Sequence, residues 1–217
     1  ADFQKHGGHV IPYFNGQLID VESHWYRHCG GEKYTVKLAS GREHMEFYPF
    51  GGPGTGLRQF GNKVFVTACP ACEEWLEVLK RNADIAIDLG CNGVFFDQLG
   101  YLSRPCCDPS HGHRVPFMNV FAVKADMVRK LAEYIHTRAP GMAFGIEWIN
   151  DITSQYADFV HNIVGGTRPE QFLELVRYVL PDVITTDRDI RDDTDIPRRV
   201  NHALRIGVRS DVEIFRC

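Results

Sequence analysis

Two acidic side chains follow directly on apolar runs of the kind that form buried strands. Asp97 ends GVFFD and Glu147 ends GMAFGIE, 50 positions further along the chain. That spacing is close to one helical crossover, so we expect both carboxyl groups at the mouths of neighbouring parallel strands. Glycoside hydrolysis uses such a pair, about 5–5.5 Å apart for retention and about 6.5–9.5 Å apart for inversion. The spacing leaves open that each acid only caps a helix or pairs with an arginine.

Polar residues also end other strand candidates. Asn15 ends the apolar part of HVIPYFNG (9–16), and Asp187 and Arg188 follow a later apolar run. We expect these three side chains to bind substrate at the same end of the sheet as the two acids. The segment DRDIRDDTD (187–195) lacks the Gly and Glu positions of an EF-hand, so a charged loop is favoured over a calcium site.

The densest polar motif is CCDPSHGH (106–113), and a second Cys pair, CPAC (69–72), precedes it. Four soft ligands could bind zinc, but adjacent cysteines cannot easily both ligate one ion, and paired CxxC spacing is absent. A redox CPAC is disfavoured because the chain has far more elements than a thioredoxin fold. We therefore expect no metal ion and no cofactor. The loop is then either purely structural or hydrogen-bonded to sugar hydroxyls through three residues: Asp108, His111 and His113.

Strand and helix candidates alternate along most of the chain. Segments 73–89 and 119–137 repeat apolar residues with the period of a helix. Such alternation predicts parallel strands joined by helices. Further helices are predicted at 153–163, 169–180 and 195–207, the last closed by Gly207, and strands at 9–16, 63–70, 93–98, 141–150, 182–187 and 210–215.

Two α/β architectures fit this alternation, a doubly wound sheet and a (β/α)8 TIM-type barrel. GGPGTG (51–56) lacks the Lys-Ser/Thr of a P-loop, which weakens the first. Polar residues at the C-terminal ends of strands favour the barrel, whose active sites form at that end. Six strand candidates are too few for a complete barrel, so we expect residues 1–217 to form one partial barrel domain, incomplete at both ends. Its open strand edges would be covered by missing barrel segments or by self-association.

The composition argues against two classes of partner. The formal net charge is −4 and no basic stripe is present, so we expect no nucleic-acid partner. No apolar run approaches the roughly 18–20 residues that span a bilayer, and no charged-then-apolar leader opens the chain, so we expect no membrane partner. The residues themselves leave the compartment undetermined.

The segment LGCNGVFFDQLG (89–100), with CCDPSHGH behind it, resembles a motif of bacterial glycoside-hydrolase-like proteins with a (β/α)8 barrel. In that family the pattern runs approximately Gly-Val-Tyr-Leu-Asp-Gln-Ile-Gly and then Cys-Tyr-Asp-Pro-Ser-His-Gly-His. The resemblance extends to HVIPYFNGQLID (9–20), to CPACEEW (69–75) and to the strand that ends in Glu147, and so covers most of the chain. The family is distantly related to endo-α-N-acetylgalactosaminidases and to α-galactosidase-type retaining enzymes.

The resemblance implies a glycoside hydrolase that cleaves an oligosaccharide or glycoconjugate by retaining double displacement. Asp97 would be the nucleophile and Glu147 the general acid and base, with Asp151 as the alternative acid. Cys107 stands where the family usually has Tyr, and EWIND departs from the Glu-Gly of relatives. The Asp and His residues of the 106–113 motif would line the sugar subsite. The aromatic candidates for stacking on a sugar are Trp25, Tyr48, Phe50 and Trp148.

Two other classes of function stay open. One is a non-catalytic carbohydrate-binding barrel or an inactive barrel fragment, and the other is a metal-dependent hydrolase built on the Cys/His loop. The resemblance to bacterial enzymes would suit a secreted or periplasmic protein. The sequence does not predict the sugar, the anomer or endo versus exo action.

Overall fold

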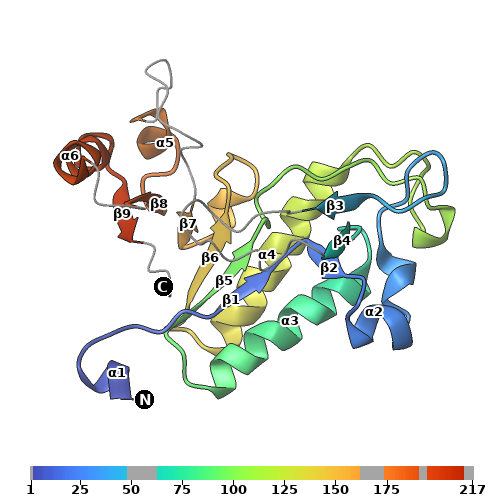
Figure 1. The fold of residues 1–217 in the computed structure, drawn as a ribbon, viewed down its shortest axis with the longest axis horizontal. Helices are drawn as coiled ribbons and strands as arrows, with labels where there is room; N and C mark the ends of the chain where they lie inside the picture. The colour runs from blue at the N-terminus through green and yellow to red at the C-terminus, as the bar shows by residue number, and fades with distance from the viewer. Residues whose placement is uncertain (1, 48–62, 162–173, 191–194, 213–217) are drawn as a thin grey trace.

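The computed structural model describes residues 2–47, 63–161, 174–190 and 195–212 (Figure 1). Its centre is a six-stranded sheet in the order β1-β5-β6-β7-β8-β9. Every neighbouring pair in this sheet is parallel, so the C-terminal ends of all its strands lie along one edge. The strands are β1 (Tyr13–Asn15), β5 (Gly93–Asp97), β6 (Ala143–Glu147), β7 (Phe159–His161), β8 (Ile184–Ile190) and β9 (Arg209–Val212).

The order of these strands in space follows their order along the chain without a reversal. A doubly wound sheet has a switch point at which the strand order reverses, whereas a barrel adds each parallel strand beside the previous one. The predicted barrel-type α/β fold is therefore confirmed. The described part of the sheet has six strands, where a complete barrel has eight.

Helices cover one face of the sheet, and in Figure 1 the strands β1, β5 and β6 lie across α3 and α4. Leu79 of α3 and Leu131 of α4 are fully buried in one core with Phe96 of β5 and Phe144 of β6. The helices predicted at 73–89, 119–137 and 195–207 are confirmed. The described helices are α1 (Asp2–Lys5), α2 (His24–His28), α3 (Glu73–Asp88), α4 (Val120–Arg138), α5 (Glu174–Val179) and α6 (Ile196–Ile206).

A second, antiparallel sheet lies between β1 and α3 in the sequence. Its strands are β2 (Leu18–Asp20), β3 (Met45–Phe47) and β4 (Val64–Thr67), in the order β2-β4-β3. The prediction that segment 63–70 is a barrel strand is therefore wrong. Its apolar run does form a strand, but an apolar run does not specify its partner, and here both partners are antiparallel.

The helix predicted at 153–163 is also wrong. This segment begins with a 3-10 turn (Ser154–Tyr156) and continues as β7. Phe159 pairs with Gly145 of β6 on one side and with Ile184 of β8 on the other. Aromatic and β-branched side chains suit a strand paired on both edges, and so short an apolar run does not distinguish helix from strand.

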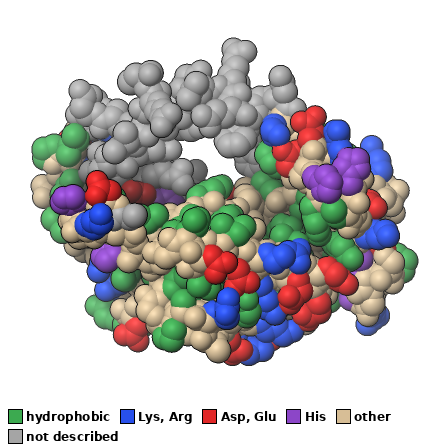
Figure 2. Space-filling view, turned by 90° about the horizontal axis from the view of Figure 1, so that it is seen from below, with side chains coloured by type: hydrophobic (Ala, Val, Ile, Leu, Met, Phe, Trp, Pro, Cys, Tyr) green, Lys and Arg blue, Asp and Glu red, His purple; other side chains and the backbone are tan. Residues whose placement is uncertain are grey.

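Several predicted features lie outside the described residues. They are the Gly-rich segment 51–56, the aromatic residues Tyr48 and Phe50, the first part of the helix predicted at 169–180 and the end of the strand predicted at 210–215. Among the described helices, none combines the length and the apolar character needed to cross a bilayer. On the face in Figure 2, acidic and basic side chains are interspersed around patches of hydrophobic ones.

The face of the sheet opposite α3 and α4 borders a cavity of about 820 Å³. Because side chains alternate along a strand, Tyr13, Phe95 and Phe159 point to this side while Phe96 points to the helices. The cavity therefore corresponds to the inside of the barrel. Its lining includes Tyr13, the first residue of β1, and His161, the last residue of β7.

Candidate active site

The carboxyl group of Asp97 is held by two side chains of the neighbouring strand. Asn15 is the register partner of Asp97, and Tyr13 lies two residues before it on β1. The Tyr13 hydroxyl donates to Asp97 Oδ2 at 2.5 Å, and Asn15 Nδ2 donates to the same oxygen at 3.2 Å. Two donors on one carboxylate oxygen fix the direction of the Asp97 side chain.

Tyr13 is suited to remain a donor. Desolvation is the largest cause that raises the pKa of its phenol, and the negative charge of Asp97 is the next, with a smaller contribution from Glu147. The phenol therefore stays protonated at neutral pH. Asn15 is fixed from its other side, because its Oδ1 accepts from the backbone N–H groups of Gln17 at 2.9 Å and Leu18 at 2.7 Å.

Glu147 ends the next strand of the sheet, β6, which pairs directly with β5. Glu147 is 9% exposed, and its Oε2 accepts a hydrogen bond from the backbone N–H of Gln98 at 3.2 Å. The donor thus belongs to the residue that follows Asp97. The prediction that the two acids end neighbouring parallel strands is confirmed, and a backbone hydrogen bond links the two strand ends.

Each acid is followed by a residue with left-handed backbone conformation. Gln98 has φ +58° and Trp148 has φ +69°. Residues other than glycine seldom adopt this conformation, which costs about 1–3 kcal/mol and is found preferentially at functional sites. Both strands thus end at their carboxylates and are followed immediately by a residue in this conformation.

Gly100 lets the two strand ends approach each other. Its N–H donates to the Glu147 carbonyl at 2.8 Å, and its own carbonyl accepts from Asn150 Nδ2 at 2.9 Å. A Cβ at this position would lie 2.0 Å from the Trp148 carbonyl oxygen and 2.4 Å from that of Glu147. Only glycine fits here, because both clashes are with backbone atoms.

Lys124 of α4 forms hydrogen bonds to the loop that follows Asp97. Its side chain is buried, at 1% exposed, and its Nζ donates to Gln17 Oε1 at 2.7 Å, to the Tyr101 carbonyl at 2.8 Å and to the Gln98 carbonyl at 3.3 Å. Burial lowers the pKa of Lys124 from an ordinary 10.5 to about 7. The three oxygens satisfy a cation that would otherwise be costly to bury.

Lys124→Met removes these hydrogen bonds, and we expect it to destabilise the protein by about 1–3 kcal/mol at pH 9. Between pH 7 and pH 10 the unfolded chain binds more protons than the folded one at this lysine, so the wild type gains stability as pH rises, by up to about 1.4 kcal/mol per pH unit. Urea titrations at several pH values check this. The difference in the free energy of unfolding between wild type and variant should widen as pH rises. A constant difference would contradict a lowered pKa for the buried Lys124.

One aromatic candidate lies beside the two acids. Trp148 follows Glu147, and its ring lies 5.5 Å from that of Tyr101, which is partly exposed in the loop after Asp97. Such a pair can present a surface to a sugar ring. Trp25 instead packs at 5.9 Å from both Trp75 and Tyr34, against the core. Asp151, the alternative acid, lies exposed in the turn after β6.

Sequence reasoning missed two residues near this site, Tyr13 and His161. His161 ends β7 as the register partner of Glu147, is 6% exposed, and its Nδ1 lies 2.8 Å from Thr186 Oγ1. The error at segment 153–163 concealed it, because a helix would not place His161 at the strand edge. Tyr13 could have been found from strand periodicity, since it lies on the same side as Asn15.

The other predicted binding residues lie in two places. Asp187 is on β8 and is 1% exposed; Arg188 follows it on the same strand, with its side chain outside the described residues. Asp108 caps a 3-10 turn (Pro109–His111), with its Oδ1 accepting from Ser110 N at 2.9 Å.

The two predicted histidines contact cysteines. His111 Nδ1 lies 3.4 Å from Cys106 Sγ, and His113 Nε2 lies 3.7 Å from Cys69 Sγ. The structure thus brings these histidines together with thiols.

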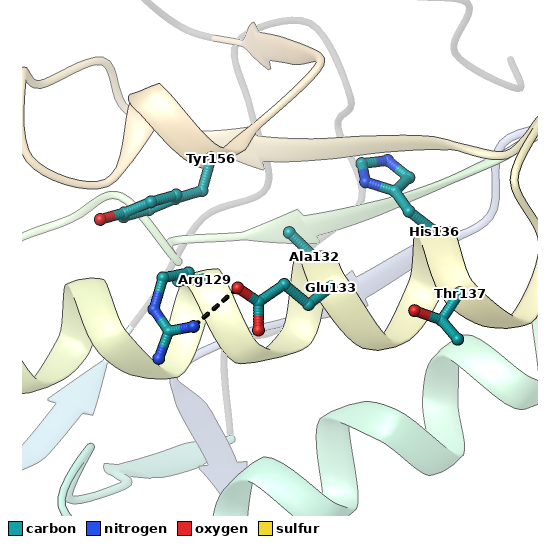
Figure 3. Close-up of a pocket in the computed structure, with 6 residues that line it drawn as sticks. All are labelled: Arg129, Ala132, Glu133, His136, Thr137 and Tyr156. Carbon is teal, nitrogen blue, oxygen red and sulfur yellow. Dashed lines mark hydrogen bonds and ion pairs between the residues drawn. The ribbon is translucent and has the colours of Figure 1, made fainter.

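A second hollow, of about 520 Å³, lies against α4 (Figure 3). Arg129 and Glu133 on this helix form an ion pair at 2.6 Å, and His136 pairs with Asp158 at 2.9 Å. The hollow is lined by residues of α4 and by Tyr156, on the helix side of the sheet, and none of the predicted site residues lines it. Its charged groups are engaged with one another, so the strand-end edge is the better candidate site.

Solved glycosidases share this fold. The alignment with α-N-acetylgalactosaminidase NagBb from Bifidobacterium bifidum has a TM-score of 0.66 at 14% identity and covers 97% of this chain and 33% of that one. The alignment with α-galactosidase TtGalA from Thermus thermophilus has a TM-score of 0.62 at 13% identity and covers 97% of this chain and 44% of that one. A GH31 sulfoquinovosidase from E. rectale gives 0.64 at 14% identity, covering 99% and 33%. At these identities the likeness establishes the fold alone, which is a barrel of the (β/α)8 type.

The particular family follows from the sequence match. Residues 1–162 match DUF6259, described as a domain of unknown function, and the chain belongs to this family. A relative from Bacteroides thetaiotaomicron, named "Putative glycoside hydrolase", is 35% identical over 113 residues, which are 51% of this chain and 15% of that protein. A relative from Monosiga brevicollis with a similar name is 29% identical over 103 residues, covering 45% and 8%. The chain thus spans a small part of these relatives.

Proposed function

We propose that this domain carries the catalytic acids of a glycoside hydrolase that retains the anomeric configuration. The observation that carries the proposal is that Asp97 and Glu147 end neighbouring parallel strands, with a hydrogen bond from the backbone of Gln98 to Glu147. Named relatives and fold neighbours support carbohydrate as the substrate class.

In the first step Asp97 Oδ attacks the anomeric carbon while Glu147 donates a proton to the leaving oxygen. The glycosidic C–O bond breaks and a glycosyl ester on Asp97 forms. In the second step Glu147 takes a proton from water, the water oxygen attacks the anomeric carbon, and Asp97 leaves as a carboxylate. Tyr13 and Asn15 support Asp97 in these roles, because both donate to its Oδ2 and so stabilise the carboxylate that attacks and leaves.

A non-catalytic carbohydrate-binding domain is the second candidate. The observation that favours it is the count of six strands in the described sheet, because a barrel with fewer than eight strands can lack residues that complete a site. Binding of a glycan without turnover of any substrate would support this candidate over the hydrolase.

Glu147→Gln tests the proposed acid and base. Poor leaving groups need protonation and good ones do not, so we expect a loss of about 10²–10⁴-fold for natural glycosides and a much smaller loss in the first step for dinitrophenyl glycosides. A panel of aryl α- and β-glycosides, starting from p-nitrophenyl α-D-galactopyranoside, measures both. Asp151→Asn is the matched control and should keep activity. Equal losses for all leaving groups in the first step, or a larger effect of Asp151→Asn, would contradict the assignment.

A further inference from the structure

We propose that Cys69, Cys106, His111 and His113 form a structural zinc site. One ligand atom from each of these four residues lies within 4.8 Å of the other three. Both cysteines are fully buried, and the His111 side chain is 2% exposed. Two thiolates and two imidazoles are the ligand set that zinc prefers in closed, four-coordinate sites.

The distances fit a tetrahedron around zinc. With Zn–S near 2.3 Å and Zn–N near 2.0–2.1 Å, a sulfur and a nitrogen ligand lie about 3.6 Å apart. Two of the four sulfur–nitrogen distances are 3.4 Å, between Cys106 Sγ and His111 Nδ1, and 3.7 Å, between Cys69 Sγ and His113 Nε2. These two pairs are already at the spacing of zinc ligands, and all four ligand atoms lie within 4.8 Å of one another.

Both imidazoles are oriented as zinc ligands usually are. The second ring nitrogen of His111, Nε2, lies 2.7 Å from the Lys33 carbonyl, and that of His113, Nδ1, lies 3.1 Å from the Arg114 carbonyl. A ring N–H that donates to a backbone carbonyl fixes the tautomer and leaves the other nitrogen free to bind metal. The His113 ring also stacks on Phe117 at 4.5 Å, which holds its plane.

The fold resolves the objection that adjacent cysteines cannot share one ion. Only one member of each Cys pair belongs to the cluster: Cys106 but not Cys107, and Cys69 but not Cys72. Loss of two thiol protons on binding makes the Zn²⁺ site electrically neutral, so burying it carries no net charge. All four ligands come from the protein, which is typical of a structural and not a catalytic zinc site.

The site would join two parts of the domain. Cys69 follows β4 of the antiparallel sheet, whereas the other three ligands lie in the loop between β5 and α4, the loop that begins just after Asp97. The apolar cluster at this junction has four buried residues, three of them cysteines. Zinc would therefore stabilise a junction at which few apolar side chains are buried. It would also fix the position of the loop that follows Asp97.

Metal analysis of the purified protein tests this inference without any glycoside. We expect one zinc per chain, and a cobalt-substituted protein with the visible absorption of a tetrahedral thiolate site. Cys106→Ser and Cys69→Ser should lose the metal, whereas the matched control Cys107→Ser should keep it. Loss of metal in Cys107→Ser equal to that in Cys106→Ser would overturn the proposal.

The wild type alone gives a second test, in case the cysteine variants fail to fold. Removing the metal with a chelator should lower Tm, and stoichiometric Zn²⁺ should restore it. A protein that binds neither Zn²⁺ nor Co²⁺ under reducing conditions, or that carries a Cys69–Cys106 disulfide when isolated, would show that the cluster is not a metal site. Each result is independent of whether the strand-end acids hydrolyse a glycoside.

Discussion

Asp97→Asn is expected to reduce hydrolysis of every substrate by about 10⁴-fold or more, because the amide cannot form the glycosyl intermediate. The variant should fold normally, since Asn can still accept hydrogen bonds from Tyr13 and Asn15 through its Oδ1. Steady-state kinetics with an activated aryl glycoside measure the loss, and thermal unfolding checks the fold.

Azide distinguishes a missing nucleophile from a merely damaged site. In Asp97→Asn it should take the place of the carboxylate and yield a glycosyl azide of inverted configuration. In Glu147→Gln it should attack the glycosyl-enzyme and yield a product of retained configuration. Wild-type-like turnover by Asp97→Asn would show that Asp97 is not the nucleophile. A glycosyl azide of inverted configuration from Glu147→Gln would show that Glu147 is the nucleophile and Asp97 the acid and base.

Gly100→Ala is expected to destabilise the protein by about 2–4 kcal/mol and to abolish most activity. The added Cβ would lie 2.0 Å from the Trp148 carbonyl oxygen, so the two strand ends that carry the acids must separate. The hydrogen bond from the Gly100 N–H to the Glu147 carbonyl would lengthen with them. Urea unfolding gives the change in stability, and kinetics give the change in activity.

Gly141→Ala is the matched control for that prediction. Gly141 precedes β6, and a Cβ there would meet no atom within 4 Å. Gly141→Ala should change the free energy of unfolding by no more than about 0.5 kcal/mol, as most surface substitutions do. If Gly100→Ala is as stable and as active as Gly141→Ala, the close backbone approach between the β5 and β6 ends is not required.

The placement of the two acids was predictable because it depends on local patterns. Each acid follows an apolar run, and helical periodicity at 73–89 and 119–137 required the crossovers that make those strands parallel. Strand partners were not predictable in the same way. The run at 64–67 has the composition of a barrel strand, yet its neighbours are the antiparallel strands β2 and β3.

The cysteine cluster shows the same limit of sequence reasoning. Cys69 and His113 are 44 positions apart and meet only because β4 and the loop after β5 fold together. The motif 106–113 could be identified from its residue types, but which member of each Cys pair faces the histidines depends on backbone direction. His161 was missed for a related reason, because its strand is short and owes its form to partners on both sides.

Trapping the glycosyl-enzyme identifies the residue that forms the covalent intermediate. A 2-deoxy-2-fluoro glycosyl fluoride slows the second step and leaves the sugar on the nucleophile, where peptide mass spectrometry can locate it. We expect one label per chain, on the peptide that contains Asp97, and no label in Asp97→Asn. A label on a different carboxylate, or turnover without any trapped intermediate together with an inverted product, would contradict the assignment of Asp97 as the nucleophile.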